Sequence, residues 1–155
     1  MKENCAVCKR INKIMNNDNP YFVAEMETGY VVLGDYQFYR GYTIFICKEH
    51  KKELHELEVG FRLKFLKEMS EVAEAVYLAF RPNKLNYELL GNLHSHMHWH
   101  IFPRYKNDKK AELPIWCTDK ISRCDNKCIP SSEELKKIKK KLLNKLNMIG
   151  YTGCS

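Results

Sequence analysis

The 155-residue sequence predicts an α+β domain: an antiparallel β-sheet with one long inserted helix and a C-terminal helix. Three observations predict this class. Short runs of β-branched and aromatic residues follow one another near the N-terminus, a long segment with helical apolar spacing interrupts them, and a second such segment lies near the C-terminus. Strands and helices arranged in this order are typical of α+β folds, whereas parallel sheets need regular alternation.

The first elements are short. Residues 5–18 are expected to form a helix that ends in the polar run 16–20. Residues 21–25 and 29–33 have the composition of strands and are separated by a turn. Residues 42–47 form a continuous β-branched and aromatic run, which predicts a buried strand.

The longest periodic segment, residues 51–80, predicts the inserted helix. Its apolar residues recur at three- and four-residue spacing, and charged residues fill the opposite face. Pro82 ends the helix because the residue before a proline disfavours the helical conformation. Gly60 lies within the pattern, so a separate short turn at 52–57 before the main helix stays open.

The second half of the chain adds two strands, a tail and a helix. Residues 85–90 predict a strand, and residues 94–102 predict a histidine-rich strand that Pro103 is expected to end. Residues 105–130 are polar and irregular and are expected to pack over the domain as a tail. A helix begins at Ser131, because a serine cap is followed there by two acidic residues.

The composition fits a single domain of ordinary soluble type, with 45% hydrophobic and 29% charged residues. We expect residues 1–104 to form its core and residues 105–155 to form a C-terminal tail and helix packed on the same domain. No stretch approaches the ~20 apolar residues that span a bilayer, so no membrane association is expected. The N-terminal segment lacks the apolar region of a secretory signal, which predicts a cytoplasmic location.

The formal charge of +7 is concentrated in one segment. Six lysines lie between Lys136 and Lys145, and without them the chain would be close to neutral. A solvated helix face explains such a cluster better than a polynucleotide-binding surface does. We therefore expect no nucleic-acid partner, although a positive field can help to capture single nucleotides.

Seven cysteines are spread along the chain: Cys5, Cys8, Cys47, Cys117, Cys124, Cys128 and Cys154. An odd number in a reducing compartment indicates metal ligands, buried apolar side chains or free thiols rather than disulfides. Cys5 and Cys8 have the spacing of a metal knuckle, although redox motifs share this spacing. The cysteines at 117, 124 and 128 have no histidine nearby and are expected to be free thiols.

Four histidines stand at every second position of one predicted strand: His94, His96, His98 and His100. Side chains alternate along a strand, so these imidazoles would project from one face at about 6.6 Å from one another. Packing four imidazoles side by side gains little, because each ring nitrogen needs a hydrogen-bond partner. Such a row is suited to binding a metal, or to proton transfer and attack on phosphorus near neutral pH.

The segment around this row resembles a known signature. Residues 96–102 read His-Met-His-Trp-His-Ile-Phe, which is similar to the histidine triad (HIT) motif, His-x-His-x-His followed by two apolar residues. Pro-Arg after the motif is common in that family, and the similarity runs from Cys5 to about Arg104. The N-terminal Cys-x-x-Cys matches a zinc-containing, bacterial-type branch of the family.

The resemblance implies hydrolysis or transfer of nucleotides at the α-phosphate. Substrates of the family are dinucleoside polyphosphates, nucleoside phosphoramidates and adenylylated compounds. The catalytic row would be His96, His98 and His100, with His98 as the nucleophile that forms a transient nucleotidyl-histidine. His100 would lie beside the phosphate oxygens and help to hold the His98 ring.

Candidate substrate-binding residues come from the same resemblance. Asn92 stands where many relatives carry glutamine, and its amide is a candidate donor to developing negative charge. His94 is an extra histidine that adjoins the triad and would either contact phosphate or face solvent. Ser95 is given a minor role, because its side chain would point away from the histidine face. Asp35 lies near the place where relatives contact the ribose, although acids in turns are usually turn formers.

The resemblance also implies a metal site. In zinc-containing relatives two histidines complete the knuckle, and the matching positions are His50 and His96. Cys5, Cys8, His50 and His96 would then form a closed tetrahedral Zn²⁺ site with a structural role. Such a site would tie the N-terminus to the sheet and fix the strand that carries His98.

Two positions depart from the commoner members of the family. Tyr42 follows Gly41 where many relatives have histidine, and Leu93 stands where many carry serine or threonine. The loop before Gly91 also looks shortened. These changes leave the attack chemistry in place and make the leaving group harder to predict.

Two alternatives stay open from the sequence. One is a metal-dependent hydrolase in which His96, His98 and His100 converge on one catalytic ion. The other is a non-catalytic nucleotide-binding regulator whose basic C-terminal helix contacts a partner. Because many relatives pair through the long helix and a sheet edge, a homodimer is expected.

Overall fold

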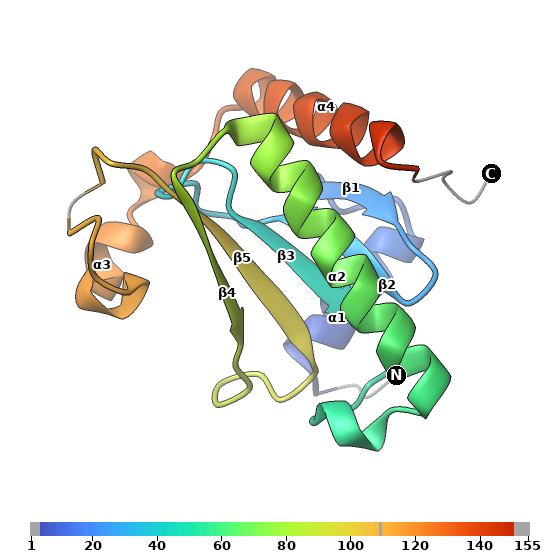
Figure 1. Ribbon diagram of the computed structural model, residues 1–155. Coiled ribbons are helices and arrows are strands. Elements are labelled where there is room, and N and C mark those ends of the chain that lie inside the picture. The colour runs from blue at the N-terminus through green and yellow to red at the C-terminus, as the bar shows by residue number, and fades with distance from the viewer. Residues whose placement is uncertain (1–3, 109, 151–155) are drawn as a thin grey trace.

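The computed structural model describes residues 4–108 and 110–150 and contains a five-stranded antiparallel sheet with helices on both faces (Figure 1). The strands are β1 (Phe22–Glu25), β2 (Gly29–Leu33), β3 (Thr43–Cys47), β4 (Lys84–Leu89) and β5 (His98–Arg104). Their order across the sheet is β1-β2-β3-β5-β4, and every neighbouring pair is antiparallel. The predicted α+β class is confirmed.

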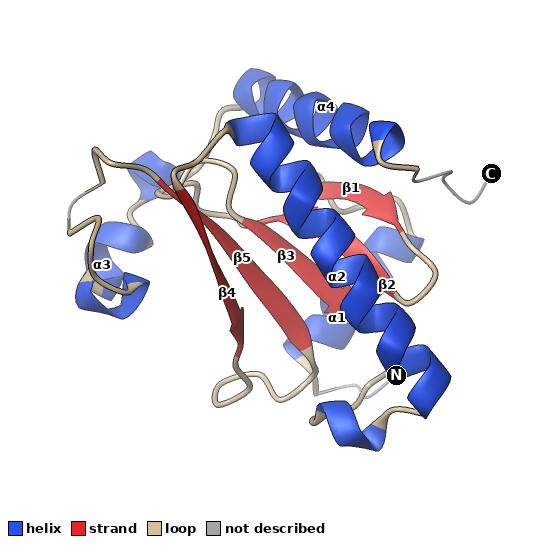
Figure 2. Ribbon diagram, viewed as in Figure 1, coloured by secondary structure: helices blue, strands red, loops and turns tan. Residues whose placement is uncertain are grey.

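Figure 2 distinguishes the helices from the strands. The longer helices are α1 (Ala6–Met15), α2 (Val59–Phe80) and α4 (Ser132–Met148). The shorter ones are η1 (Leu54–Glu56), η2 (Ile115–Cys117), α3 (Lys120–Arg123) and η3 (Asn126–Cys128). No helix in the described ranges combines the length and the apolar character that crossing a bilayer requires.

The sheet is buried on both faces, which explains why β2 is buried at every position. Alternate residues of β2 face opposite sides. Tyr30 and Val32 pack in a cluster with Val7 and Ile11 of α1. Val31 belongs instead to the larger core on the other face. β2 therefore contributes apolar side chains to two separate cores, one on each face of the sheet.

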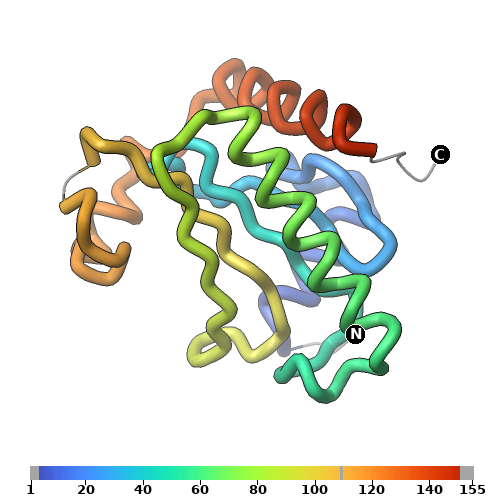
Figure 3. Tube along the Cα trace, in the orientation of Figure 1, coloured from blue at the N-terminus to red at the C-terminus, as the bar shows by residue number. Residues whose placement is uncertain are grey.

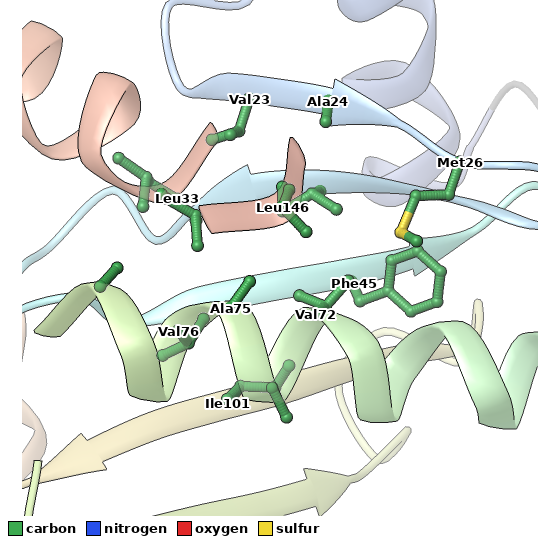
Figure 4. Close-up of a cluster of buried hydrophobic side chains, with 14 of the residues drawn as sticks. Val23, Ala24, Met26, Leu33, Phe45, Val72, Ala75, Val76, Ile101 and Leu146 are labelled. Atoms are coloured by element: carbon green, nitrogen blue, oxygen red, sulfur yellow. The ribbon is translucent and has the colours of Figure 1, made fainter. Parts of the chain in front are cut away.

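The larger core lies under α2 and α4. Figure 4 shows Val72 and Val76 of α2 and Leu146 of α4 turned toward strand residues that include Phe45 and Ile101. These five side chains are essentially inaccessible to solvent. Burying a side chain of this size contributes about 1.5–3 kcal/mol, so this face supplies most of the packing that holds the sheet.

The boundaries of α2 follow from local chemistry. The Glu58 carboxylate accepts a hydrogen bond from the Phe61 backbone N–H, which caps the first turn. Arg81 ends the helix in the left-handed conformation at φ 52°, directly before Pro82. The open alternative of a separate short turn is confirmed, because η1 precedes α2.

The predicted histidine strand over 94–102 is wrong at its beginning. β5 begins only at His98, and residues 90–97 form the loop that joins it to β4, drawn in yellow in Figure 3. The Met97 backbone is held from two sides: its N–H donates to Lys51 O at 2.9 Å and its carbonyl accepts from Cys47 N at 3.1 Å. The bond from Cys47 N continues the register of β3 and β5 by one pair, whereas the Met97 N–H turns to Lys51, so the regular ladder ends here and His94 and His96 lie in the loop.

Pro103 does not end β5, contrary to the prediction. The strand continues to Arg104 and pairs with β4 as far as Lys84. The pairing with β3 stops earlier, at Ile101. Pro103 therefore lies where β5 has a strand neighbour on one side only, and a residue without a backbone N–H is tolerated at such a position.

The chain after β5 folds back onto the face of the sheet that α1 covers. Arg104 is buried, and its guanidinium donates to Asn86 Oδ1 and to Leu113 O, both at 2.9 Å. Ile115 is fully buried and packs with Tyr39 and Phe102. The segment expected to be irregular thus contains three short helices and contributes to a third apolar cluster.

The helix predicted to begin at Ser131 is confirmed. The Ser131 side chain accepts a hydrogen bond from Glu134 N and caps α4. Its apolar stripe comprises Leu135, Ile138, Leu142 and Leu146, all buried, with Leu143 packed at its side. The lysines predicted to form a solvated face lie mostly on the opposite side.

Candidate functional site

His98 and His100 lie side by side on the face of β5 that α1 covers. In the register of the sheet, His98 is opposite Ile46 and His100 is opposite Ile44 of β3. Residues that are directly opposite share a face, and Ile44 and Ile46 pack with α1. The two imidazole rings are 4.6 Å apart between centroids and meet edge to face. Trp99 between them points to the larger core, as the alternation predicts.

The hydrogen bond of His98 determines which ring nitrogen is available. Nδ1 lies 2.6 Å from the backbone carbonyl oxygen of His96. A carbonyl oxygen only accepts, so Nδ1 carries the hydrogen and Nε2 of the neutral ring keeps its lone pair. Burial lowers the pKa of His98, and only 8% of the residue is exposed. The ring is therefore neutral and held in one tautomer.

His100 is held by Tyr42. The Tyr42 hydroxyl lies 2.6 Å from His100 Nδ1, and its ring stacks on His100 and on Phe102. Burial lowers the pKa of His100 to about 3, with a smaller effect from the neighbouring His98, and burial raises the pKa of Tyr42. The phenol therefore donates to the neutral imidazole, which leaves the hydrogen of His100 on Nε2. Tyr42 stands where many relatives have histidine, and it supplies a donor there.

A cavity of about 190 Å³ lies next to this stack. Tyr42, Ile44 and Phe102 line it from the sheet, Arg10 from α1, and Arg123 from the chain after β5. The cavity is thus bounded by two guanidinium groups and by aromatic rings. This combination suits a ligand that carries negative charge.

The predicted ribose contact, Asp35, lines the same cavity but already has a partner. Its carboxylate forms an ion pair with Arg10, whose Nη1 donates to Asp35 Oδ2 at 3.3 Å and whose other terminal nitrogen makes a shorter bond. The Asp35 side chain is 47% exposed. A ribose hydroxyl would therefore meet an ion pair at this position rather than a free carboxylate.

The remaining predicted substrate-binding residues lie in the loop between β4 and β5. Asn92, His94 and Ser95 are all exposed, and none lies in a strand. Burial is the main cause that lowers the pKa of His98 and of His100, and the charge of His94 acts in the same direction to a smaller extent. The loop is therefore beside the two histidines and open to solvent.

The four predicted metal ligands converge. Ligand atoms of Cys5, Cys8, His50 and His96 all lie within 4.8 Å of one another. Cys8 Sγ is 3.2 Å from His50 Nδ1 and 3.4 Å from His96 Nδ1, and Cys5 Sγ is 3.9 Å from His96 Nδ1. A tetrahedral Zn²⁺ with bonds of ~2.3 Å to sulfur and ~2.0 Å to nitrogen separates such ligands by about 3.5 Å. The donor set and its spacing therefore fit zinc.

The surroundings orient these ligands. His96 Nε2 donates to the Cys47 carbonyl at 2.8 Å, so Nδ1 is the nitrogen that faces the sulfurs. Cys5 caps α1, and its sulfur accepts from Cys8 N at 3.4 Å. Because α1 begins directly after Cys5, both cysteines lie at its first turn, where they meet the two histidines in one cluster.

Two residues of this region were not predicted from the sequence. Glu88 lies opposite His100 in the register of β4 and β5, and its Oε2 is buried without a hydrogen-bond partner among the described residues. Burial raises the pKa of Glu88 to about 7, although Arg123 and Arg104 act in the opposite direction. Neither Glu88 nor Arg123 belongs to a motif, and only pairing and packing bring them here.

Comparison with known proteins is consistent with this geometry. The model of the HIT domain matches residues 17–107. None of the curated proteins searched matches the sequence.

Solved structures share the fold. A histidine triad protein from Marinobacter aquaeolei is 23% identical, with a TM-score of 0.71 over 83% of this chain and 90% of that one. A hypothetical histidine triad nucleotide-binding protein from Sulfolobus tokodaii is 20% identical, with a TM-score of 0.69 over 97% and 100%. A Zn-bound histidine triad family protein from Mycobacterium smegmatis is 23% identical, with a TM-score of 0.62 over 94% and 95%. The family model covers more than half of the chain, and the chain therefore belongs to the HIT domain family.

Proposed function

We propose that this protein is a nucleotide hydrolase or nucleotidyltransferase that acts at the α-phosphate through a covalent nucleotidyl-histidine at His98. One observation carries the proposal: the hydrogen bond from His98 Nδ1 to the His96 carbonyl leaves Nε2 of a neutral imidazole as the free nucleophilic nitrogen. Proposed substrates are dinucleoside polyphosphates, nucleoside phosphoramidates or adenylylated compounds.

The reaction has two balanced steps. In the first step His98 Nε2 attacks the α-phosphorus, an N–P bond forms, the bond from phosphorus to the leaving group breaks, and the leaving group takes up a proton. In the second step water attacks the same phosphorus, the N–P bond breaks, Nε2 regains its lone pair, and a nucleoside monophosphate leaves together with one proton of the water. Splitting one displacement in this way lowers the barrier of each part.

His100 and Tyr42 support the attacked phosphate. The Tyr42 hydroxyl holds His100 so that its Nε2–H points away from the phenol, next to His98. A phosphate oxygen at this position would accept that hydrogen bond as its charge grows. Donors that are fixed before the reaction stabilise the transition state more effectively than mobile ones.

The metal-dependent alternative is less well supported. His96 Nδ1 is directed at the two cysteine sulfurs, and His98 Nδ1 is occupied by a backbone carbonyl. The available ring nitrogens of His96, His98 and His100 therefore do not point to one common metal position. The group of ligand atoms found in the described part of the chain includes His96 but neither His98 nor His100.

The proposal is tested by trapping the intermediate. The protein is mixed with an adenylylated substrate, quenched in alkali, and analysed by peptide mass spectrometry. The expected result is an AMP adduct on the peptide that contains His98, absent from His98→Asn and present in His55→Asn, a control at an exposed histidine of η1. Turnover by wild type with no adduct, or full turnover by His98→Asn, would contradict the covalent route. Binding of nucleotide without any turnover would favour the non-catalytic regulator.

We further propose that Cys5, Cys8, His50 and His96 hold a structural zinc, as in a zinc-containing branch of the family. All four positions would be filled by protein ligands, which leaves no place for a reactive water. The ion would connect α1 to the loop that precedes β5. The described cysteines form no disulfide, and a reducing compartment preserves thiols, so the cytoplasm is the proposed location.

A homodimer is proposed from the exposed edge of the sheet. β4 is an edge strand, and Tyr87 of β4 and Tyr77 of α2, each 46% exposed, flank one surface groove. Light scattering after size exclusion should give twice the monomer mass for wild type and the monomer mass for Tyr87→Lys. A monomeric wild type would show that the edge is not an interface.

A further inference from the structure

The chain after the matched HIT domain contributes directly to the cavity beside the catalytic histidines. We call residues 115–128 the tail segment; the family model ends at residue 107. This segment is fixed by specific contacts: the Tyr39 hydroxyl donates to Thr118 Oγ1 at 3.1 Å, and Gln37 N donates to Cys128 O at 2.7 Å. Ile115 is buried between Tyr39 and Phe102. The tail segment is therefore a built wall of the cavity.

Arg123 of the tail segment is held in a defined place. Its Nε donates to the Thr118 carbonyl at 3.0 Å, and its guanidinium lies 5.6 Å from the centre of the Trp116 ring. Arg123 lines the cavity together with Tyr42. None of its hydrogen bonds or ion pairs to the described residues uses the two terminal nitrogens, so four of the five N–H groups of the guanidinium are available for a ligand.

The two arginines of the cavity differ in their charge balance. Arg10 is neutralised by the Asp35 carboxylate. Arg123 has no carboxylate within ion-pairing distance among the described residues, and its positive charge acts on Tyr42 and on Glu88. A preorganised guanidinium without a counter-ion is suited to bidentate recognition of a phosphoryl group.

The contacts that connect His98 to the cavity indicate which phosphoryl group of the substrate Arg123 would bind. His98 contacts His100, His100 contacts Tyr42, and Tyr42 lines the cavity with Arg123. A phosphorus under attack by His98 lies at a residue that does not line the cavity, whereas Arg123 lines it. Arg123 is thus placed for a phosphoryl group other than the one attacked.

We propose that Arg123 is a specificity-determining residue that binds a second phosphoryl group of the substrate. The inference rests on the proposed function, because it takes His98 as the point of attack. It narrows the substrates to nucleotidyl compounds with at least one phosphoryl group besides the α-phosphate. That group belongs either to a phosphoanhydride leaving group or to a phosphorylated ribose.

The test compares three adenylyl substrates. Adenosine phosphoromorpholidate has one phosphorus, diadenosine tetraphosphate has further phosphates on the leaving side, and 3′-phosphoadenosine phosphoromorpholidate has one on the ribose. For wild type, kcat/KM is expected to be highest for one of the two substrates with additional phosphate. Arg123→Gln should reduce kcat/KM for that substrate about 10- to 100-fold, which corresponds to the loss of one charge-assisted hydrogen bond. For adenosine phosphoromorpholidate, kcat/KM of the variant should stay within about threefold of the wild-type value.

Two control variants distinguish the loss of the Arg123 charge from a disturbance of the fold. Lys120→Gln removes one positive charge from the same short helix and should leave the preference unchanged, because Lys120 does not line the cavity. Arg123→Lys keeps the charge and should retain part of the preference, which a mere packing role would not predict. An equal loss on all three substrates, or no loss with Arg123→Gln, would show that Arg123 does not select for phosphate.

A further measurement keeps this inference distinct from the proposed function. Binding of inorganic triphosphate is measured by calorimetry, with no turnover required. Wild type and Lys120→Gln should bind it at least about 10-fold more tightly than Arg123→Gln. If wild type hydrolyses none of the substrates yet shows this difference, the function is wrong and the anion site stands. If the affinities are equal, the anion site is wrong whatever the enzyme activity.

Discussion

His96 and His98 are two residues apart, yet the structure fixes their rings in opposite tautomers. In His96 the hydrogen of the ring is on Nε2, which donates to the Cys47 carbonyl, and Nδ1 faces two sulfurs. In His98 the hydrogen is on Nδ1, which donates to the His96 carbonyl, and Nε2 is free. Each ring is fixed by one carbonyl oxygen, and the position of that oxygen decides which nitrogen remains for chemistry.

The comparison explains why one motif can serve two functions. A metal ligand and a nucleophile both need a neutral imidazole with one lone pair available. What differs is the direction of that lone pair. His96 lies in the loop before β5, and its Nδ1 meets the two cysteines at the start of α1. His98 is the first residue of β5, and its ring lies beside His100 on the face that α1 covers. The regular strand begins only at His98, which separates the proposed metal site at His96 (the metal end) from the proposed site of attack on phosphorus at His98 (the phosphorus end).

The largest expected effect comes from removing the nucleophile. His98→Asn should lower kcat by about 10⁴-fold or more, because no other group of the row offers a free nitrogen at that point. Zinc content should stay at one ion per chain. Steady-state AMP release and elemental analysis measure the two properties, and loss of zinc from His98→Asn would show that the two ends are not separate.

The metal end is tested by Cys8→Ser. The sulfur of Cys8 lies within 3.4 Å of both histidine ligands, so serine should lose the ion. The expected cost is about 3 kcal/mol or more of unfolding free energy, since metal binding contributes to folding. Cys117→Ser at an exposed thiol should have neither effect. Metal analysis and denaturant unfolding measure both, and full zinc occupancy in Cys8→Ser would remove Cys8 from the ligand set.

The link between Tyr42 and His100 should give a smaller effect. Tyr42→Phe keeps the stack on Phe102 and removes the hydroxyl that orients His100. The expected result is a fall in kcat of about 5- to 50-fold with little change in KM, in line with the loss of one buried hydrogen bond. His98 adduct formation should slow by the same factor in a rapid-quench experiment. An unchanged rate would mean that His100 needs no such support.

The smallest effect concerns Glu88, opposite His100. Burial raises its pKa from the ordinary 4.5 to about 7, so its charged form is disfavoured in the folded state. This group therefore lowers stability progressively as the pH rises from about 4.5 to about 7, and Glu88→Gln removes that loss. Because the side chain is only partly buried, we expect the variant to gain about 1 kcal/mol at pH 8 and nearly nothing at pH 4.5. Denaturant unfolding at both pH values measures the difference, and an equal gain at both would assign it to packing.

Local sequence patterns determined several of the secondary-structure elements of this protein. The periodicity of residues 51–80, the Ser131 cap and the apolar run at 42–47 each specify an element, because their chemistry acts within a few residues. The Cys5–Cys8 spacing and the alternate histidines marked the chemistry, since ligand spacing and side-chain alternation are local properties as well.

Tertiary structure decided the rest. The break in the strand before His98 depends on the bond from Met97 N to Lys51 O, which lies far away in sequence. Arg123 reaches the cavity only because the chain after β5 folds back over the sheet. The sequence identified the histidines, but the tautomer of each ring depends on which carbonyl oxygen it meets. For His96 that oxygen belongs to Cys47, which is distant in the sequence, and such a hydrogen bond leaves no trace in the local pattern.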